Sequence, residues 1–563
     1  MSHRAHPQRI EFVPSKEFTP SKSSEEAFEQ IMEALKDDKV NMIGLCGMGG
    51  VGKTTLVQKV GTIARESQLF DEVLMATVSQ NPNVIDIQNQ MADKLGMDFK
   101  EKSNAGRADR LWQRLKEVEK MLIILDDVWK VIDFQEIGIP LGDGRRGSKI
   151  LLTTRLQGIC SYMECRKKVL LSPLPEKEAW DLFRINAGLR DGDSTLNTVA
   201  REVARECQGL PIALVTVGRA LRGKSRVQWE VASRQLKESQ FVRMEQIDEQ
   251  NNAYTCLKLS YDYLKYEETK SCFVVCCLFP EDYYIPAEEL TRYAVGYGLY
   301  QDVNSIEDAR KRVYMEIENL KACCMLLRTH SEEYVKMHDL VRDVAIQIAS
   351  SEKYGFMVKA GFGLKEWPVS NKSFEGCTVI LLMGNKLTKL PEGLVCPQLK
   401  VLLLGLDDGL NVPVTFFEGM KAIEVLSLNG GCLSLQSLEF STKLQSLLLI
   451  RCVCKRTSDQ MTTHGHGSQK DFLPRLEHVE VNGCRDIRTL FPAKWRQALK
   501  NVISVDIRYC KSLEVVFELD EGINEEKELP LLSSLTELQL SRLRKLKCIC
   551  QPPKSYSSEI ESC

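Results

Sequence analysis

The chain has 563 residues, a length that predicts three or four domains at about 150 residues each. Its 75 lysines and arginines nearly balance its 77 aspartates and glutamates, which argues against nucleic acid or an anionic membrane as the main partner. The 20 cysteines follow no disulfide framework, and we find neither a secretory signal nor an apolar stretch of the ~18 residues that a spanning helix needs. We therefore expect a soluble, cytoplasmic protein with reduced thiols.

The first strong motif is GMGGVGKTT. A helix is predicted from Ser24, capped by Ser23 or Ser24, and it leads into an apolar strand at residues 42–45. The glycine-rich motif follows this strand, and an amphipathic helix begins at Thr54. Strand, loop and helix in this order predict a phosphate-binding loop in preference to an ordinary glycine-rich turn. We assign nucleotide binding to Gly47, Met48, Gly49, Gly50, Val51, Gly52, Lys53, Thr54 and Thr55.

The residue types of this loop suit a nucleotide together with Mg²⁺. Glycines let consecutive backbone N–H groups turn toward the β- and γ-phosphates, and the N-terminus of the following helix adds a partial positive charge. We expect Lys53 to reach the terminal phosphates, Thr54 to ligate Mg²⁺ and Thr55 to meet the α-phosphate.

Two further predicted strands end in polar side chains. Asp126 and Asp127 follow the apolar run at 121–125, and Arg155 follows a strand at 148–153. Open α/β sheets bind ligands at the carboxyl ends of their strands, so Asp126 is expected to hold Mg²⁺, directly or through water, and Asp127 to orient or deprotonate an attacking water. These are the two candidate catalytic residues. Arg155 is expected to sense the γ-phosphate, with an ordinary surface arginine as the alternative. The absence of an N-K-x-D or T-K-x-D motif argues against a GTPase of the Ras kind.

From Lys168 onward the pattern is predominantly helical. A helix at 212–220 follows Pro211, and a proline at the first turn of a helix loses no hydrogen bond. Further along, a short strand at 334–337 precedes His338, which lies at the head of a helix predicted at 340–349. A histidine beside a helix N-terminus can donate to a nucleotide phosphate, although a simple capping role is the alternative.

Six motifs in this order resemble the NB-ARC module of plant nucleotide-binding, leucine-rich-repeat disease-resistance proteins. They are GMGGVGKTT, MLIILDDVW, GSKILLTTR, GLPIAL, CFVVCCLFPEDYYIP and MHD. The resemblance is to the non-TIR, coiled-coil-type branch, because Trp129 follows the paired aspartates. It implies a module of three subdomains that closes over ADP and opens on exchange for ATP. It also implies that Pro211 packs on the adenine side, that Arg155 senses the phosphates and that His338 contacts the ADP β-phosphate.

One departure from that family concerns its N-terminal coiled-coil domain. Only about forty residues precede the phosphate-binding loop, and we find no four-helix block among them. We therefore expect either a truncated form or a protein that works without that domain.

Beyond residue 350 the periodicity changes to L-x-x-L-x-L frames. Seven of them begin at Cys377, Leu399, Ile423, Leu444, Leu476, Val502 and Leu535, in steps of 22, 24, 21, 32, 26 and 33 residues. Each frame predicts one short strand, and neighbouring strands stack into a curved leucine-rich-repeat solenoid. Asn429, Cys484 and Cys510 fall near the ladder position of such repeats. The stretch with His464 and His466 is expected to be a solvated loop instead of a metal site.

The predicted fold is multidomain: an α/β P-loop NTPase of the STAND type, then helical and winged-helix subdomains, then a C-terminal leucine-rich-repeat α/β solenoid. The expected parts are a flexible N-terminal segment (1–24), a nucleotide-binding α/β domain (25–165), a helical subdomain (166–245), a winged-helix-like subdomain (246–350), a linker (351–372), the repeats (373–548) and a polar tail (549–563).

These inferences predict an intracellular plant immune receptor that acts as an ADP/ATP-dependent switch with Mg²⁺ and triggers a defence response. Its repeats would recognise a pathogen effector or a guarded host protein and contribute to autoinhibition. Self-association on activation and a peripheral location at membranes stay open, and no dedicated nucleic-acid or transmembrane interaction is expected. The alternatives are a truncated, non-signalling adaptor or decoy and a slow turnover ATPase.

Overall fold

The computed structural model describes residues 21–80, 82–101, 103–140, 147–190, 194–241, 249–300, 306–329, 331–368, 374–455, 473–492, 495–518 and 532–551. The chain forms two compact units. The first comprises Met1–Lys270, Glu281–Tyr284 and Ile317–Val344, and the second comprises Ser271–Pro280, Ile285–Glu316 and Ala345–Cys563. Most of the predicted N-terminal segment, the loop with His464 and His466 and most of the polar tail lie outside the described residues.

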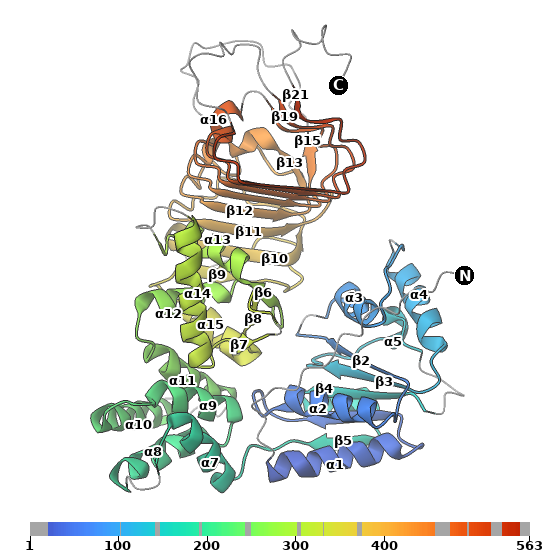
Figure 1. The fold of residues 1–563 in the computed structure, drawn as a ribbon, viewed down its shortest axis with the longest axis vertical. Helices are drawn as coiled ribbons and strands as arrows, with labels where there is room; N and C mark the ends of the chain where they lie inside the picture. The colour runs from blue at the N-terminus through green and yellow to red at the C-terminus, as the bar shows by residue number, and fades with distance from the viewer. Residues whose placement is uncertain are drawn as a thin grey trace. The chain divides into compact units, whose positions relative to one another are not determined.

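The first unit contains a parallel sheet of five strands in the order β2-β3-β4-β1-β5 (Figure 1). Its strands are β1 (Met42–Cys46), β2 (Glu72–Thr77), β3 (Met121–Asp126), β4 (Lys149–Thr154) and β5 (Lys167–Leu170). Every residue of β3 and β4 is buried, as expected for central strands that helices cover on both faces. The helical prediction from Lys168 is wrong at its start, because β5 is a short edge strand in which only Val169 is buried.

Helices cover both faces of this sheet. One face packs against α1 (Lys22–Lys36) and α2 (Lys53–Glu66), and the other against α3 (Val84–Lys94), α4 (Asn104–Lys116), α5 (Phe134–Ile137) and α6 (Gln157–Tyr162). The N-cap of α1 is Ser21, whose hydroxyl accepts a hydrogen bond from the Ser24 N–H at 3.0 Å. The predicted cap at Ser23 or Ser24 is therefore wrong, because Ser24 is the third helical residue and completes the capping box.

The strand order brings three chain segments to one edge of the sheet. β4 lies between β3 and β1, so the residues that follow these strands are neighbours. The N–H of Gly47, after β1, donates to the Thr154 carbonyl at 3.2 Å, and the N–H of Asp127, after β3, donates to Thr153 Oγ1 at 2.9 Å. This edge therefore carries the glycine-rich loop, the paired aspartates and Arg155 together.

Five helices follow in the first unit: α7 (Glu176–Ala187), α8 (Ser194–Glu206), α9 (Pro211–Leu221), α10 (Arg226–Phe241) and α11 (Glu249–Asp262). Pro211 is the first residue of α9, where its missing N–H removes no hydrogen bond. The ring of Phe183 in α7 meets Trp229 of α10 edge to face at 5.9 Å, and both side chains are fully buried.

The next elements are α12 (Glu267–Cys276), β6 (Tyr284–Pro286), α13 (Ala287–Tyr297), α14 (Ile306–Ala322), β7 (Leu327–Arg328), β8 (Tyr334–Lys336) and α15 (Asp339–Ala349). The boundary between the two units passes through α12, α14 and α15. β7 and β8 pair antiparallel, and β8 leads directly to α15. Pro286 is the last residue of β6 and also the N-cap of α13.

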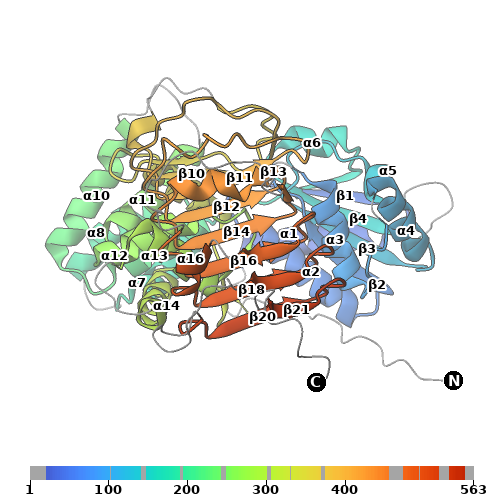
Figure 2. The ribbon, with the colours of Figure 1, turned by 90° about the horizontal axis from the view of Figure 1, so that it is seen from above.

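The repeats of the second unit form one parallel sheet in the order β20-β18-β16-β14-β12-β11-β10-β9 (Figure 2). Its strands are β9 (Phe356–Val358), β10 (Val379–Leu387), β11 (Val401–Leu406), β12 (Val425–Asn429), β14 (Ser446–Ile450), β16 (His478–Asn482), β18 (Ser504–Arg508) and β20 (Glu537–Ser541). Each of the seven predicted frames overlaps one of these strands, which begins two residues after the first residue of the frame. The eighth, β9, lies within residues 351–372, for which we predicted a linker.

The other side of the repeats consists mostly of short strands and 3₁₀ turns. These elements are η1 (Phe374–Gly376), β13 (Cys432–Ser434), η2 (Leu435–Phe440), β15 (Val453–Lys455), β17 (Thr489–Phe491), α16 (Arg496–Leu499), β19 (Val515–Glu518) and β21 (Cys548–Gln551). Leucine, valine and phenylalanine side chains fill the space between the two sides. None of the helices in the described part of the chain has the length and apolar character to cross a membrane.

Buried thiols form a ladder through the later repeats. The Sγ of Cys484 donates to the Leu449 carbonyl at 3.3 Å, and the Sγ of Cys510 donates to the Val481 carbonyl at 3.6 Å, as their predicted ladder positions require. Cys452, which we had not placed in the ladder, makes the same kind of contact to backbone carbonyls of the preceding repeat.

In the first repeat, an asparagine in place of a cysteine donates hydrogen bonds to backbone carbonyls. The Nδ2 of Asn385 donates to the carbonyls of Lys359 and Leu382 at 2.8 and 3.0 Å, and its Oδ1 accepts from the Leu364 N–H at 3.0 Å. The predicted ladder position of Asn429 is wrong, because its half-buried side chain accepts hydrogen bonds from Arg451.

Replacing Asn385 by alanine should destabilise the repeats by about 1–3 kcal/mol, because one buried and two partly buried backbone groups would lose their partner. Asn429→Ala is the matched control, since its side chain is more exposed, and we expect a loss below about 0.5 kcal/mol. Urea unfolding of the two variants measures both losses. Equal losses would contradict a larger contribution of the buried Asn385 amide to the free energy of unfolding.

Candidate functional site

The loop between β1 and α2 depends on glycine. Gly50 and Gly52 have φ angles of 74° and 103°, a region that side-chain-bearing residues rarely adopt. A Cβ on Gly47 would lie 2.6 Å from the Leu171 carbonyl oxygen. Gly52 is the N-cap of α2 and offers no side-chain hydrogen bond, so the first N–H groups of α2 remain able to bind an anion.

Lys53 is buried within this loop. Its ammonium donates to the carbonyls of Gly47 and Met48, both at 2.8 Å. Burial, followed by the nearby charge of Arg155, lowers the pKa of Lys53 to about 8. Both hydrogen-bond partners are neutral, so a phosphate would be a stronger partner for this cation.

The predicted Mg²⁺ ligands, Thr54 and Asp126, are in direct contact. Thr54 Oγ1 donates to one carboxylate oxygen of Asp126 at 2.8 Å, and Thr153 Oγ1 donates to the other at 2.5 Å. Asp126 is 3% exposed, and burial is the main cause that raises its pKa. A hydroxyl at the start of α2 and a carboxylate at the end of β3 are hard oxygen ligands, so the residues present fit a magnesium ion.

Asp127 is held by two neighbours. It has a positive φ of 56°, and its carboxylate accepts a hydrogen bond from Trp129 Nε1 at 2.7 Å. The other carboxylate oxygen lies 3.5 Å from Nε of Arg155, whose guanidinium also stacks over the Trp129 ring at 4.7 Å. The carboxylate of Asp127 is thus fixed in orientation by an indole and a guanidinium.

Arg155 also contacts the head of α15. Its Nη2 lies 3.4 Å from a carboxylate oxygen of Asp339, and the two side chains are 7% and 17% exposed. Carboxylate oxygens of Asp127, Glu281 and Asp339 all lie within 4.8 Å of one another. Arg155 supplies compensating positive charge to two of these three groups.

The crowding of carboxylates shifts their pKa values. Burial, followed by the charge of Asp127, raises the pKa of Glu281 to about 7. Burial also raises the pKa of Asp339, and the charges of Asp282 and Glu281 raise it further. Our sequence reasoning missed Glu281 and Asp282, although both lie in the motif CFVVCCLFPEDYYIP. Two acidic residues in a motif that is otherwise mostly apolar could have indicated a functional role.

His338 is neutral and oriented. Its Nδ1 accepts a hydrogen bond from the Leu340 N–H at 3.2 Å, which places the ring proton on Nε2. Burial, followed by the charge of Arg155, lowers the pKa of His338 to about 4. A neutral imidazole with Nε2–H is able to donate a hydrogen bond to a phosphate oxygen.

The first residues of α9 and α15 cover the glycine-rich loop. A Cβ on Gly50 would lie 2.5 Å from Ile212 Cγ2 and 3.0 Å from Leu340 Cδ1. A Cβ on Gly49 would lie 3.1 Å from Leu340 Cδ2 and 3.2 Å from Nη1 of Arg155. We had not predicted that apolar side chains contact the glycine-rich loop, although Ile212 follows Pro211 directly and Leu340 follows the MHD motif.

The remaining predicted residues lie in the same region. Val51 is buried against Gly47, and Thr55 is half-buried in the first turn of α2. Pro211 begins α9 immediately before Ile212. The expected contacts of Thr55 with an α-phosphate and of Pro211 with adenine stay predictions.

Two protein families match this chain. The NB-ARC domain matches residues 24–191, and the leucine-rich repeats of plant disease resistance proteins like RPS2 match residues 442–559. The NB-ARC match supports nucleotide binding at this site.

Plant proteins of Arabidopsis thaliana are similar over most of the chain. "Probable disease resistance protein At4g27220" is 37% identical over 79% of this chain and 49% of its own length. "Disease resistance protein At4g27190" is 36% identical over 76% of this chain and 44% of its own length. "Disease resistance protein RPS5" is 34% identical over 71% of this chain and 46% of its own length. The chain thus spans about half the length of the curated relatives that it matches.

Among solved structures, a Signal Transduction ATPase with Numerous Domains from Pyrococcus horikoshii is 17% identical. Its TM-score is 0.38, over 62% of this chain and 45% of that chain.

Glu281→Gln should stabilise the protein at high pH. The unfolded chain releases the glutamate proton near pH 4.5 and the folded chain near pH 7, so the free energy of unfolding falls as pH rises between these values. Glutamine stays neutral, and its advantage should grow across this window toward at most about 3 kcal/mol, less because the partly exposed side chain is screened by solvent.

Urea midpoints measured from pH 4.5 to 8 check this expectation. The exposed Glu333→Gln variant is the control and should follow the wild type at every pH. A constant difference between Glu281→Gln and the wild type would contradict the pKa assignment.

Proposed function

Since this chain is a relative of the plant NB-ARC, leucine-rich-repeat disease-resistance proteins, as its motifs predicted, we propose that it is an intracellular immune receptor and an ADP/ATP-dependent switch. In this proposal the closed form holds ADP and is latent. Exchange for ATP favours the open form, which triggers the defence response. A nucleotide acts on such an equilibrium only through its different affinities for the two forms.

The observation that carries this proposal is the position of Arg155. Its guanidinium contacts Asp127 at the sheet edge and Asp339 at the head of α15, and it lies beside Gly49 of the phosphate-binding loop. A γ-phosphate near this loop would compete with Asp339 for the guanidinium, because a phosphate binds the fork of an arginine strongly. Loss of the pair between Arg155 and Asp339 would release α15 from the loop.

His338 stabilises the closed form in this scheme. It is the residue before Asp339, and its Nε2–H is available to donate to a β-phosphate oxygen. Because α15 begins at Asp339, opening of α15 would withdraw the imidazole from the nucleotide. ADP and the closed position of α15 would therefore stabilise each other.

In this proposal, residues of α2 and β3 bind the magnesium ion and the phosphates. Thr54 and Asp126 would hold the ion, and Lys53 would bind the terminal phosphates. The ion, when bound, would neutralise part of the phosphate charge. Thr153 orients the carboxylate of Asp126 for this task.

Asp127 bears on the alternative of a turnover ATPase. Its carboxylate already accepts from Trp129 and pairs with Arg155, so neither oxygen is reserved for an attacking water. This arrangement favours a switch with slow hydrolysis over an enzyme that depends on rapid turnover.

The repeats contribute recognition and autoinhibition in this proposal. Within the second unit, α13 packs on the face of the parallel sheet: Lys400 donates to the Tyr297 carbonyl at 2.9 Å, and Arg292 lies 3.6 Å from Glu480. A pathogen effector or guarded host protein that bound this face would compete with α13. Such competition would couple recognition to release of the latent form.

Lys53→Ala should reduce the affinity for ADP by about two orders of magnitude, because a charged hydrogen-bond partner of the phosphates is lost. Denaturing release and chromatography of the nucleotide from native protein measure the occupancy. Lys59→Ala, on the same helix, is the control and should retain wild-type occupancy. Stoichiometric ADP in the Lys53 variant would rule out the assigned role.

Asp339→Asn should speed ADP release about tenfold, which corresponds to a loss of about 1.4 kcal/mol from the closed form. The substitution keeps the size of the side chain and removes its charge toward Arg155. Stopped-flow displacement of a fluorescent ADP analogue measures the rate, with the exposed Asp262→Asn as control. An unchanged rate would show that the ion pair does not hold the closed form.

A further inference from the structure

Three buried thiols lie directly behind the phosphate-binding loop. Cys46 is the last residue of β1, Cys160 lies in α6 and Cys165 lies between α6 and β5; they are 5%, 0% and 6% exposed. The Sγ atoms of Cys46 and Cys160 are 2.7 Å apart. A covalent disulfide has its sulfur atoms about 2.05 Å apart, so bond formation between these two needs less than about 1 Å of movement.

A glycine in the middle of β1 makes room for these sulfur atoms. A Cβ on Gly44 would lie 2.5 Å from the Sγ of Cys160 and 3.1 Å from the Sγ of Cys165. Any larger residue at this position would push the thiols away from the strand. The close approach of the three thiols is therefore built into the sheet.

The hydrogen bonds among the thiols shift their pKa values in opposite directions. The hydrogen bond between Cys160 and Cys165 is the largest cause that lowers the pKa of Cys165, and the same bond raises the pKa of Cys160 to about 11. The positive charge of Lys168 also lowers the pKa of Cys165. Cys165 is thus the member of the cluster that first becomes a thiolate, and its hydrogen bond to Cys160 places it to receive that thiol's proton while the Cys160 sulfur reacts.

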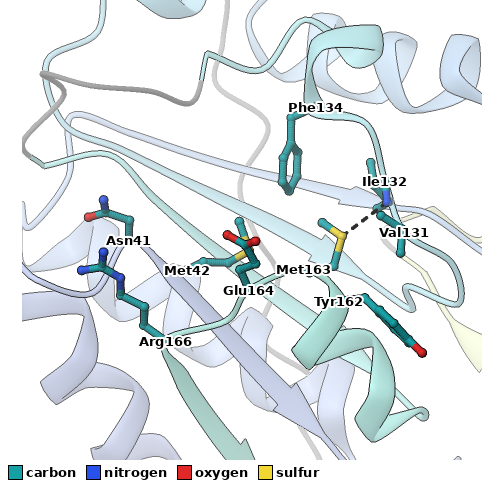
Figure 3. Close-up of a pocket in the computed structure, with 9 residues that line it drawn as sticks. All are labelled: Asn41, Met42, Val131, Ile132, Phe134, Tyr162, Met163, Glu164 and Arg166. Atoms are coloured by element: carbon teal, nitrogen blue, oxygen red, sulfur yellow. Dashed lines mark hydrogen bonds between the residues drawn. The ribbon is translucent and has the colours of Figure 1, made fainter.

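A pocket lies beside the residues on either side of Cys165. It has a volume of about 350 Å³, and Asn41 and Met42 line it at the start of β1 (Figure 3). Its lining comprises Asn41, Met42, Val131, Ile132, Phe134, Tyr162, Met163, Glu164 and Arg166. Glu164 and Arg166 flank Cys165 in the chain, so a molecule as small as hydrogen peroxide reaches the residues on either side of this thiol.

We propose that Cys46 and Cys160 form an oxidation site, which hydrogen peroxide converts to a disulfide that ties the base of the phosphate-binding loop to α6. As a thiolate, Cys165 takes the proton of Cys160 while the sulfur of Cys160 attacks one peroxide oxygen. The O–O bond breaks, an S–O bond forms, and the leaving hydroxide takes the proton back from Cys165 to become water.

The second step forms the disulfide. The sulfur of Cys46 attacks the sulfur of Cys160, the S–S bond forms and the S–O bond breaks. The departing hydroxide leaves as water with the thiol proton of Cys46. In total, two thiols lose two electrons and two protons, and one hydrogen peroxide becomes two molecules of water.

The disulfide would join two segments that hold the nucleotide. Cys46 precedes Gly47, and α6 follows Arg155 after one intervening residue. The cross-link would restrict their relative movement and slow nucleotide exchange. This consequence rests on the proposed function, whereas formation of the disulfide does not.

Peptide mapping of the full chain after graded hydrogen peroxide tests the site. We expect the number of free thiols to fall by two and a linked peptide of Cys46 and Cys160 to appear. Cys165→Ser should slow formation of this product without changing it. Cys160→Ala should abolish it, and Cys256→Ala, which removes a buried thiol 4.0 Å from Cys207, should not. Oxidation of the wild type without a Cys46–Cys160 peptide would overturn the proposal.

ADP release from the same samples tests the consequence. Oxidation should slow release by about fivefold or more, the lower end of ordinary coupling between sites, and a thiol reductant should restore it. An unchanged rate in protein that carries the disulfide would overturn the regulatory part. Protein that binds no nucleotide before oxidation would overturn the regulatory part together with the proposed function, while the peptide map still decides the oxidation site.

Discussion

The buried guanidinium of Arg155 is the interaction on which the arrangement of the site depends. Several carboxylates converge near it, among them Asp127, Glu281 and Asp339. Buried like charges repel one another strongly because little water screens them, so they need a cation or a proton to remain together. Arg155 provides the cation for two of them, and a raised pKa lets Glu281 retain its proton. Removing or redirecting this one side chain would leave the head of α15 facing uncompensated negative charge.

Much of the site could be predicted because its residues occur in continuous motifs. The phosphate-binding loop, Asp126 and His338 each lie at the junction of two elements, where local patterns are informative. Ile212, Leu340 and Glu281 escaped prediction because their roles arise from contacts between segments far apart in the chain. Each of them lies close to the end of a predicted element. The apolar or acidic character of a residue does not by itself reveal which distant segment its side chain will contact.

The same distinction explains the errors in the fold. Four residues of β5 are too few for a clear alternation, and pairing with β1 decides their conformation. The repeat frames were predictable in spite of their uneven steps, because a strand needs only its own short pattern and the intervening segments tolerate different lengths. Cys452 was missed because a thiol that packs and a thiol that donates look alike in a sequence.

The ladder has a mechanical consequence for the repeats. In the first repeat, the amide of Asn385 holds three backbone groups at once, whereas Cys452, Cys484 and Cys510 contribute weaker thiol donors. Each repeat contacts chiefly its two neighbours, so the resistance of the array to bending is set repeat by repeat. We therefore expect the repeats around β14 to β18 to bend more readily than those near β10, so that this part of the sheet can adjust to a bound partner.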